Sequence, residues 1–263
     1  MALLTVQKGQ RPFWTCWIFC CFSGFFKRCE SEKEGGTPVK IPLSNRLLAC
    51  CGYVKPGDRV ADVGCDHGYL GIYLLKNGIA SAVIASDIRE MPLQSAIRNA
   101  EKFGVKERMS FCLSDGIRDV PREFDCMVCA GMGADTMMSI LDAAPWLKSE
   151  RYRLILQCQS KRPELRRYLY RQGYAIRRET LAKDGKFIYP VMEVVYAPGE
   201  TLTDGEYYIT PALRRSGSEL LPAFREGVLS GLRKTVTGLS GGDEEKYRHY
   251  KAILEELTHD DCS

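Results

Sequence analysis

Histidine is scarce in this sequence, and no histidine lies near a cysteine at the spacing of a metal site. The three histidines are His67, His249 and His259, while Cys126 and Cys129 form an isolated C-x-x-C within a predicted strand. Side chains alternate along a strand, so these two cysteines face opposite ways and cannot easily hold one ion. The sequence therefore argues against a zinc site, and we expect no metal.

An apolar run long enough to cross a membrane is also missing. The segment from Phe13 to Phe26 is rich in aromatic residues and cysteine, but a spanning helix needs about 20 apolar residues. No A-x-A cleavage site follows it. We interpret residues 1–36 as a leader that is disordered or results from a start site placed too early, with a cysteine-rich anchor as the alternative. No stable membrane association is expected.

The cysteines lack the spacing of a disulfide framework, although the chain of 263 residues contains 12 of them. Cys20–Cys21 and Cys50–Cys51 are adjacent pairs, and others fall inside predicted strands. This pattern is typical of reduced, mostly buried thiols in a cytoplasmic protein. The net charge of +4 is compatible with an anionic partner but does not identify one. Nothing in the composition predicts an oligomeric state.

Short apolar segments alternate with helical segments over residues 37–197, which predicts a parallel α/β sheet. Asp184-Gly185 separates the last two strands by a tight turn, so they should form an antiparallel edge. Seven strands in this arrangement describe the class I methyltransferase fold, a doubly wound, mostly parallel, Rossmann-like sheet. The predicted strands are Arg59–Val63, Ala82–Ser86, Met109–Leu113, Phe124–Cys129, Tyr152–Cys158, Tyr174–Glu179 and Phe187–Val195.

Strand signals stop near Pro198, and residues 198–263 are predicted to form a small C-terminal α-helical domain. Helical patterns cover Pro211–Val236 and Asp243–Leu257, separated by Ser240-Gly241-Gly242. Two antiparallel helices packed as a hairpin are the simplest arrangement of these segments.

The loop after the first strand does not have the G-x-G-x-x-G pattern of a dinucleotide site, because Asp66 replaces the second glycine of Gly64-Cys65-Asp66-His67-Gly68. A pyrophosphate would meet a carboxylate there, which is repulsive. A cationic sulfonium cofactor with an amino-acid tail would instead favour Asp62 and Asp66 nearby. The alternative role for Asp66 is a simple N-cap of the next helix.

Acidic residues also end the second and third strands. Asp87 is placed where an acid of this fold commonly binds ribose hydroxyls, and Asp115-Gly116 fits contacts to an adenine amino group, with a simple turn as the alternative. These positions predict an S-adenosylmethionine site. The predicted cofactor-binding residues are Asp62, Gly64, Cys65, Tyr69, Leu70, Asp87, Ile88, Asp115, Gly116, Gly131 and Gly133.

Gly131-Met132-Gly133 follows the fourth strand, where this fold usually keeps its reactive loop. It lacks the Asn/Asp-Pro-Pro-aromatic run of exocyclic-amine methylation and the Pro-Cys of pyrimidine carbon methylation. A ring nitrogen such as adenine N1 already carries a lone pair, so placement and stabilisation of the cationic product would suffice. Asp66, His67 and Met132 are the predicted catalytic residues.

The segment Lys161–Arg178 contains seven basic residues and one acid, with tyrosines between them. Arg162, Arg166, Arg167 and Arg171 lie at helical spacings that predict a basic stripe able to bind phosphates. A solvated helix face is the alternative, but such faces normally mix both signs of charge. We predict a nucleic-acid surface here.

Together these motifs resemble the bacterial tRNA adenine-22 N1-methyltransferase family. The resemblance rests on Leu43–Leu47, Ala61–Leu70, Ala85–Ile88, Pro92–Ala96, Asp115-Gly116, Ala130–Gly133, Leu154–Gln157 and Gly185–Tyr189, in order along the chain. It implies a methyltransferase that uses S-adenosylmethionine and acts on tRNA, with Arg46 and Gln157 near the substrate, and it fits the helical C-terminal part.

Three positions depart from the family pattern. Ala134 replaces the last glycine of Gly-Met-Gly-Gly, and Cys158-Gln159 replaces Pro-Asn after Gln157. The family usually has Gly-Pro after the acid of the second strand, where Glu90-Met91-Pro92 intervenes here. We expect Gln159 to keep an amide beside the reactive loop. The alternatives are a methyltransferase that acts on another RNA base, a protein or a small molecule, and a tRNA- or cofactor-binding protein without activity.

Overall fold

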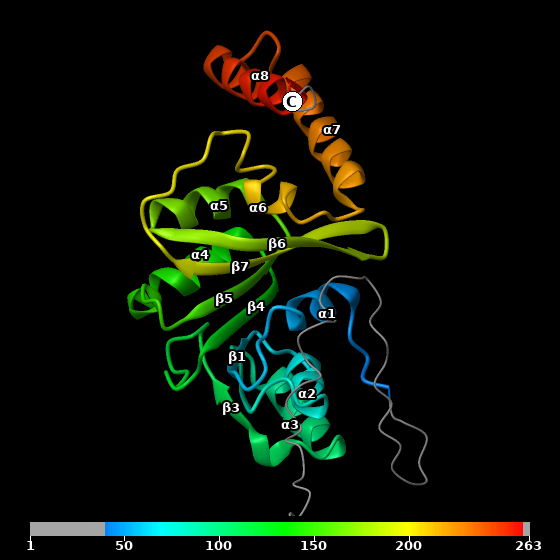
Figure 1. The fold of residues 1–263 in the computed structure, drawn as a ribbon, viewed down its shortest axis with the longest axis vertical. Coiled ribbons are helices and arrows are strands. Elements are labelled where there is room, and N and C mark those ends of the chain that lie inside the picture. Colours follow the sequence, from blue (N-terminus) through cyan, green and yellow to red (C-terminus); the bar gives the residue numbers. More distant parts are fainter. Residues whose placement is uncertain (1–39, 260–263) are drawn as a thin grey trace, which may run out of the picture. The chain divides into compact units, whose positions relative to one another are not determined.

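The structure is a computed structural model that describes residues 40–259, which belong to one compact unit. A seven-stranded sheet with the order β3-β2-β1-β4-β5-β7-β6 forms its centre (Figure 1). Strands β1 to β5 are parallel, and β7 runs antiparallel to both β5 and β6. The strands are β1 (Arg59–Val63), β2 (Ala82–Asp87), β3 (Met109–Leu113), β4 (Cys126–Met132), β5 (Arg153–Cys158), β6 (Tyr174–Asp184) and β7 (Phe187–Tyr196).

Helices cover both faces of the sheet, and each face has its own apolar core. One core joins the sheet to α1 (Asn45–Cys51), α2 (Tyr69–Lys76) and α3 (Glu90–Lys102). The other joins it to α4 (Ala134–Asp142) and α5 (Arg162–Arg171), with the short 3-10 helix η2 (Pro145–Leu147). A second 3-10 turn, η1 (Lys106–Arg108), leads into β3. The predicted doubly wound α/β sheet is therefore confirmed.

The C-terminal part consists of α6 (Pro211–Arg214), α7 (Leu221–Leu239) and α8 (Glu244–His259). Helices α7 and α8 pack on each other, and their apolar side chains share a core with α6 and with Leu181 and Ile188 of the β6–β7 hairpin. The predicted single helix Pro211–Val236 is wrong, because the chain breaks between Arg214 and Leu221. Gly217 takes a positive φ of 64° in that break, and Pro222 starts the new helix.

Two further expectations meet the structure here. Strand β6 extends five residues beyond the predicted Glu179, to Asp184. Asp66 is not an N-cap, because α2 begins at Tyr69 with Gly68 before it. The predicted leader, residues 1–36, lies outside the described residues.

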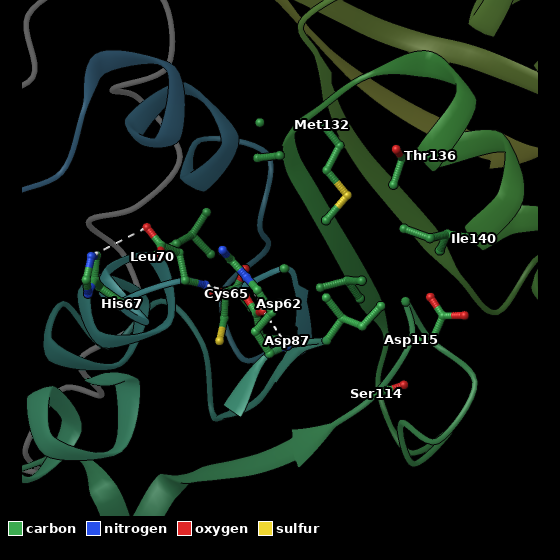
Figure 2. A pocket seen from close by; sticks show the side chains of 18 of the residues that line it. Asp62, Cys65, His67, Leu70, Asp87, Ser114, Asp115, Met132, Thr136 and Ile140 are labelled. Carbon is green, nitrogen blue, oxygen red and sulfur yellow. Dashed lines mark hydrogen bonds and ion pairs between the residues drawn. The ribbon is translucent and has the colours of Figure 1, made fainter. Parts of the chain in front are cut away.

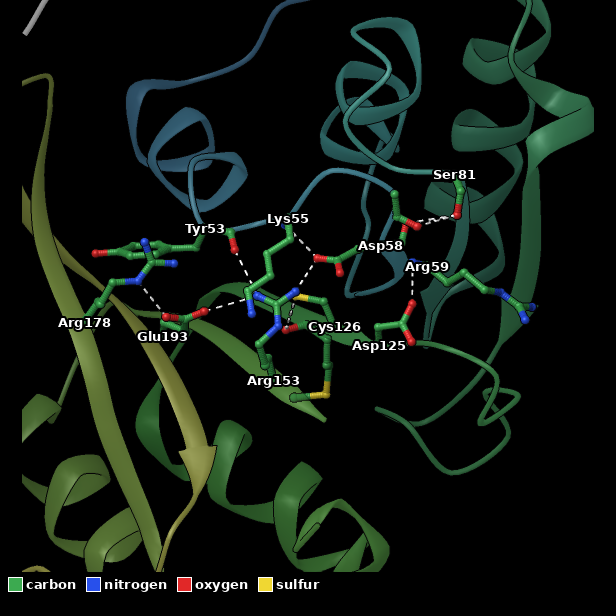
Figure 3. Close-up of polar contacts among 12 residues, drawn as sticks. Tyr53, Lys55, Asp58, Arg59, Ser81, Asp125, Cys126, Arg153, Arg178 and Glu193 are labelled. Carbon is green, nitrogen blue, oxygen red and sulfur yellow. Dashed lines mark hydrogen bonds and ion pairs between the residues drawn. The ribbon is translucent and has the colours of Figure 1, made fainter. Parts of the chain in front are cut away.

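A network of charged side chains ties the strand starts together, at the edge of the sheet opposite the strand ends that carry the predicted site (Figure 3). Arg153, at the start of β5, pairs with Asp58 before β1 and with Glu193 of β7 at 3.1 Å. Glu193 also accepts a hydrogen bond from Arg178 of β6 at 2.7 Å. Arg153, Asp58 and Glu193 are largely buried, whereas Arg178 is about half exposed. Their contacts link β5, β6 and β7 with the residue before β1, so the network has a structural role.

Cys126 and Cys129 belong to the cores on opposite faces of the sheet, as the strand alternation predicts. Burial raises the pKa of each thiol to about 12, which keeps both protonated and unreactive near neutral pH. Within residues 40–259, no group of histidine, cysteine and carboxylate side chains is arranged to hold a metal ion. None of the helices in that range has the length and apolar character needed to span a bilayer.

Candidate functional site

A cavity of about 690 Å³ lies at the carboxyl ends of β1, β2, β3 and β4 (Figure 2). Ligands bind at this edge in open α/β sheets, because loops and helix starts converge there. Predicted residues from α1 and from all four strand ends with their following loops line it: Arg46, Asp62, Gly64, Cys65, Asp66, His67, Tyr69, Leu70, Asp87, Ile88, Asp115, Gly116, Gly131 and Met132. The structure thus brings together segments that are separated by up to 86 residues.

The β1–α2 loop has a backbone that only certain residues tolerate. Gly64 has a φ of 76°, a conformation that side-chain-bearing residues rarely adopt, and a Cβ there would lie 2.2 Å from Met132 Cε, so the Met132 side chain would have to move. Asp66 also has a positive φ of 50°. Its side chain is 65% exposed and lies 3.7 Å from His67 Nε2, so both side chains face open space at the cavity. The loop is therefore held in one conformation beneath Met132.

Asp62 places an unsatisfied carboxylate oxygen at the cavity wall. Its side chain is buried, and Oδ2 has no hydrogen-bond partner among the described residues. The pKa of this carboxyl is raised to about 7, chiefly by burial, with a smaller contribution from the neighbouring Asp87 carboxylate, while the Gly71 N–H acts to lower it. A buried acceptor without a partner costs free energy, so a ligand donor that reaches Oδ2 would be strongly favoured.

Asp87 connects two loops of the cavity. Its Oδ2 accepts a hydrogen bond from the Asp66 N–H at 3.2 Å, and its Oδ1 accepts one from the Arg89 N–H at 3.0 Å. A carboxylate has about four lone-pair positions, so each oxygen can still accept another donor. Asp87 therefore both fixes the loop and remains able to bind ligand hydroxyls.

The reactive loop at the end of β4 is tied to α1 through Gln157. Its Oε1 accepts hydrogen bonds from Arg46 Nη1 at 2.9 Å and from the Gly131 N–H at 3.1 Å. Gly131 has a φ of 83°, and a Cβ there would approach Arg46 Nη1 to 3.1 Å. Gln157 is itself buried and does not line the cavity. It positions Arg46 and the loop, while the substrate contact predicted for Gln157 is wrong.

Gly133 is the one predicted cofactor residue that does not line the cavity; it precedes α4 and faces Ser160. Four residues of α4 were missed: Asp135, Thr136, Ser139 and Ile140. They are spaced as i, i+1, i+4 and i+5, which puts them on one face of a helix that starts at the reactive loop. This helical spacing is the sequence signal from which they could have been predicted. The other unpredicted lining residues are Leu47, Val63, Arg89, Ser114 and Ala130.

The predicted basic stripe is interrupted, because Arg166 is buried with 1% of its side chain exposed. Its guanidinium pairs with Glu179 and donates hydrogen bonds to the carbonyls of Tyr207 and Tyr208. Glu179 also accepts the hydroxyl of Thr210. The prediction that Arg166 binds substrate is therefore wrong: the side chain anchors the segment before α6 to α5 and β6.

The neighbouring arginines are partly engaged as well. Arg167 pairs with Asp204 at 2.8 Å and stacks over the Tyr207 ring. Arg162 lies over the Phe224 ring and lines a second cavity of about 340 Å³ between the start of α5 and helices α7 and α8. Gln159 lies beside the reactive loop, since its backbone N–H donates a hydrogen bond to the Met132 carbonyl at 2.9 Å, but it lines this second cavity and not the first. The role expected for its side-chain amide stays a prediction.

Comparison with known proteins identifies the family to which the chain belongs. Residues 43–192 match the methyltransferase domain family. The tRNA (adenine(22)-N(1))-methyltransferase of Bacillus subtilis (strain 168) is 32% identical over 167 residues, which cover 63% of this chain and 70% of that protein.

Two solved structures share the fold over most of the chain. The B. subtilis M1A22 tRNA methyltransferase TrmK is 28% identical, with a TM-score of 0.70 over 83% of this chain and 95% of that one. A Streptococcus pneumoniae protein assigned as a tRNA (m1A22) methyltransferase, in complex with S-adenosyl-L-methionine, is 26% identical, with a TM-score of 0.73 over 82% of this chain and all of that one. The chain therefore belongs to the methyltransferase domain family and, within it, to the tRNA (adenine(22)-N(1))-methyltransferase family.

Proposed function

We propose that this protein transfers a methyl group from S-adenosylmethionine to N1 of adenine 22 in tRNA. The observation that carries the proposal is the cavity in which Asp62, Asp87 and the Asp66-His67 loop meet Gly131-Met132. The tRNA substrate is supported by the similarity of this chain to the tRNA (adenine(22)-N(1))-methyltransferase of Bacillus subtilis. The acceptor nitrogen, the tRNA and the roles of individual residues are parts of this proposal.

The cavity suits a sulfonium cofactor better than a nucleotide diphosphate. Asp62, Asp66 and Asp87 put three carboxylates around it, which would repel a pyrophosphate. The unpartnered Asp62 Oδ2 fits the ammonium of the methionine part, and Asp87 retains acceptor positions for ribose hydroxyls. When bound, S-adenosylmethionine supplies an electrophilic methyl group.

The residues around the acceptor side act by placement and charge. Adenine N1 has a free lone pair, so no general base has to remove a proton before methylation. Methylation makes the base cationic, and the exposed Asp66 carboxylate can stabilise that charge. Met132 packs across the Gly64 loop and limits the space open to a flat base. Arg46, held by Gln157, offers a donor to an acceptor atom of the nucleotide.

The tRNA body would lie against basic side chains outside the cavity. After the correction for Arg166, Arg162 and Lys161 line the second cavity, and Arg171 is exposed near the end of α5. Helices α7 and α8 form the other wall of that cavity, so we propose that α5 and the C-terminal helices hold the tRNA together. Such phosphate contacts would make tRNA affinity fall steeply with salt.

The test is methyl transfer by the full chain to unmodified tRNA, followed by analysis of the digested nucleosides. The expected product is N1-methyladenosine, located at position 22 by mapping the modified fragment. N6-methyladenosine or a methylated guanosine would contradict the acceptor atom. Cofactor binding without any RNA methylation would contradict the tRNA substrate and favour a small molecule or protein.

A further inference from the structure

The hairpin formed by β6 and β7 extends beyond the rest of the sheet (Figure 1). Strand β7 pairs with β5 only from Met192 to Val195, whereas its pairing with β6 continues to Asp184 opposite Phe187. Gly185 and Lys186 form the turn, with Gly185 at a φ of 59°. The free end of the hairpin therefore carries Asp184, Lys186 and Phe187 outside the sheet.

Two contacts fix this hairpin tip beside the main cavity. Asp184 Oδ2 lies 3.6 Å from Nε of Arg46, which lines the cavity. The Asn45 side chain donates a hydrogen bond to the Lys183 carbonyl at 2.9 Å. Both Asn45 and Arg46 start α1, and α1 packs against β6. The Arg46 side chain thus contacts both the hairpin tip and the cavity.

An aromatic surface lies on the same side of the hairpin as this contact. Asp184 and Phe187 are directly opposite in the antiparallel pair, so their side chains share a face, and Tyr189 is two residues further along that face. The rings of Phe187 and Tyr189 are 6.0 Å apart. Phe187 is 55% exposed, and Lys186 Nζ lies 5.3 Å from the centre of its ring.

Phe187 and Lys186 present an accessible aromatic ring directly beside a positive charge. An aromatic ring beside a lysine is a suitable binding surface for an unpaired nucleotide. Aromatic rings stack on bases of any sequence, and a lysine nearby neutralises the phosphate. A target adenine that enters the cavity through its Watson–Crick edge must leave its stack, which exposes the base beside it.

We propose that the hairpin tip, Lys186 with Phe187 and Tyr189, is a stacking platform for the nucleotide next to the methylated base. The proposal rests on the proposed tRNA substrate. Phe187 holds the neighbouring base against its ring, Lys186 contacts the phosphate, and Arg46 connects this platform to the cavity. The platform thereby favours substrates in which the target adenine and its neighbour are both unstacked.

The experiment compares Phe187→Leu, which keeps an apolar side chain without a ring, with Phe187→Tyr, which keeps the ring. For Phe187→Leu we expect tRNA affinity to fall and KM for tRNA to rise by roughly fivefold or more. Affinity for S-adenosylmethionine and the unfolding midpoint should stay unchanged. Phe187→Tyr is expected to restore tRNA affinity because it restores the stacking surface.

Lys186→Gln and Lys76→Gln form the matched charge pair, since Lys76 is exposed at the end of α2, away from the cavity. The Lys186 variant should reduce the salt slope of tRNA binding by about 1, and the Lys76 variant should not.

Unchanged tRNA affinity in Phe187→Leu, or equal losses of affinity in Phe187→Leu and Phe187→Tyr, would overturn the proposal of a stacking platform. A wild-type chain that binds tRNA but transfers no methyl group would instead contradict the proposed function.

Discussion

The backbone N–H of Asp66 donates a hydrogen bond to the Asp87 carboxylate at 3.2 Å. This contact joins the end of β2 to the most unusual residue of the β1–α2 loop, which has a φ of 50°. An acid at the end of the second strand therefore does more than offer acceptors to a ligand. It also holds the loop that we propose faces the methylated base.

Asp87→Ala is expected to weaken S-adenosylmethionine binding by about 1–3 kcal/mol, because ligand hydroxyls and the Asp66 N–H both lose an acceptor. Isothermal titration calorimetry measures the change. Asp119→Ala is the control, since it removes an exposed carboxylate that does not line the cavity. Equal affinities of Asp87→Ala and the wild-type chain would remove Asp87 from the binding site.

The pKa of Asp62, about 7 in the unliganded protein, predicts a pH-dependent affinity for the cofactor. Below that pH the carboxyl is neutral, and a bound ammonium group favours the ionised form. Affinity should therefore fall as pH is lowered from about 7.5 to 5.5, approaching a limit of roughly tenfold per pH unit. Asp62→Asn should bind more weakly and lose this dependence. A flat profile in the wild-type chain would contradict the proposed role of Asp62.

The same shift has a consequence for the unliganded fold. The folded pKa lies above the unfolded value of about 3.9, so the protonated carboxyl favours folding. Its contribution is present below about pH 4 and is lost as pH rises toward 7. Asp62→Asn should remove this part of the pH dependence of unfolding.

The variant Asp66→Asn tests the role of the Asp66 charge in catalysis without disturbing the fold of the loop. Asparagine tolerates positive φ, so the loop should keep its conformation while the side chain loses its charge. We expect kcat for tRNA methylation to fall by roughly 10²-fold, with tRNA affinity unchanged and cofactor affinity affected much less than kcat. Single-turnover kinetics at saturating tRNA provides the measurement. A variant with wild-type kcat would exclude charge stabilisation by Asp66.

Arg166→Ala should destabilise the protein by about 3–5 kcal/mol, because it leaves Glu179 buried without its partner. Denaturant unfolding measures this, with exposed Arg171→Ala as the control, expected within about 0.5 kcal/mol of wild type. The account would be wrong if Arg166→Ala unfolded like the wild-type chain and instead lost tRNA affinity, as a phosphate contact would.

Local sequence patterns were sufficient to predict the strands and most of the residues that line the cavity. The ends of parallel strands converge at one edge of the sheet whatever the details of packing. Asp62, Gly64, Asp87 and Asp115 followed from that rule. Arg166 did not, since helical spacing places it in a basic stripe with Arg162. Its burial depends on Tyr207 and Thr210, roughly 40 residues later, folding back over α5. Only tertiary structure distinguishes an anchor from a phosphate contact.

The central claim, methylation of N1 at adenine 22, is tested most directly with two tRNAs that differ at one atom. One carries adenosine at position 22, and the other carries 1-deazaadenosine, in which a C–H replaces N1. Transfer of a labelled methyl group from S-adenosylmethionine by the full chain is measured on both. The account predicts one methyl group per adenosine-22 tRNA and none on the 1-deaza tRNA. Equal labelling of both would contradict it.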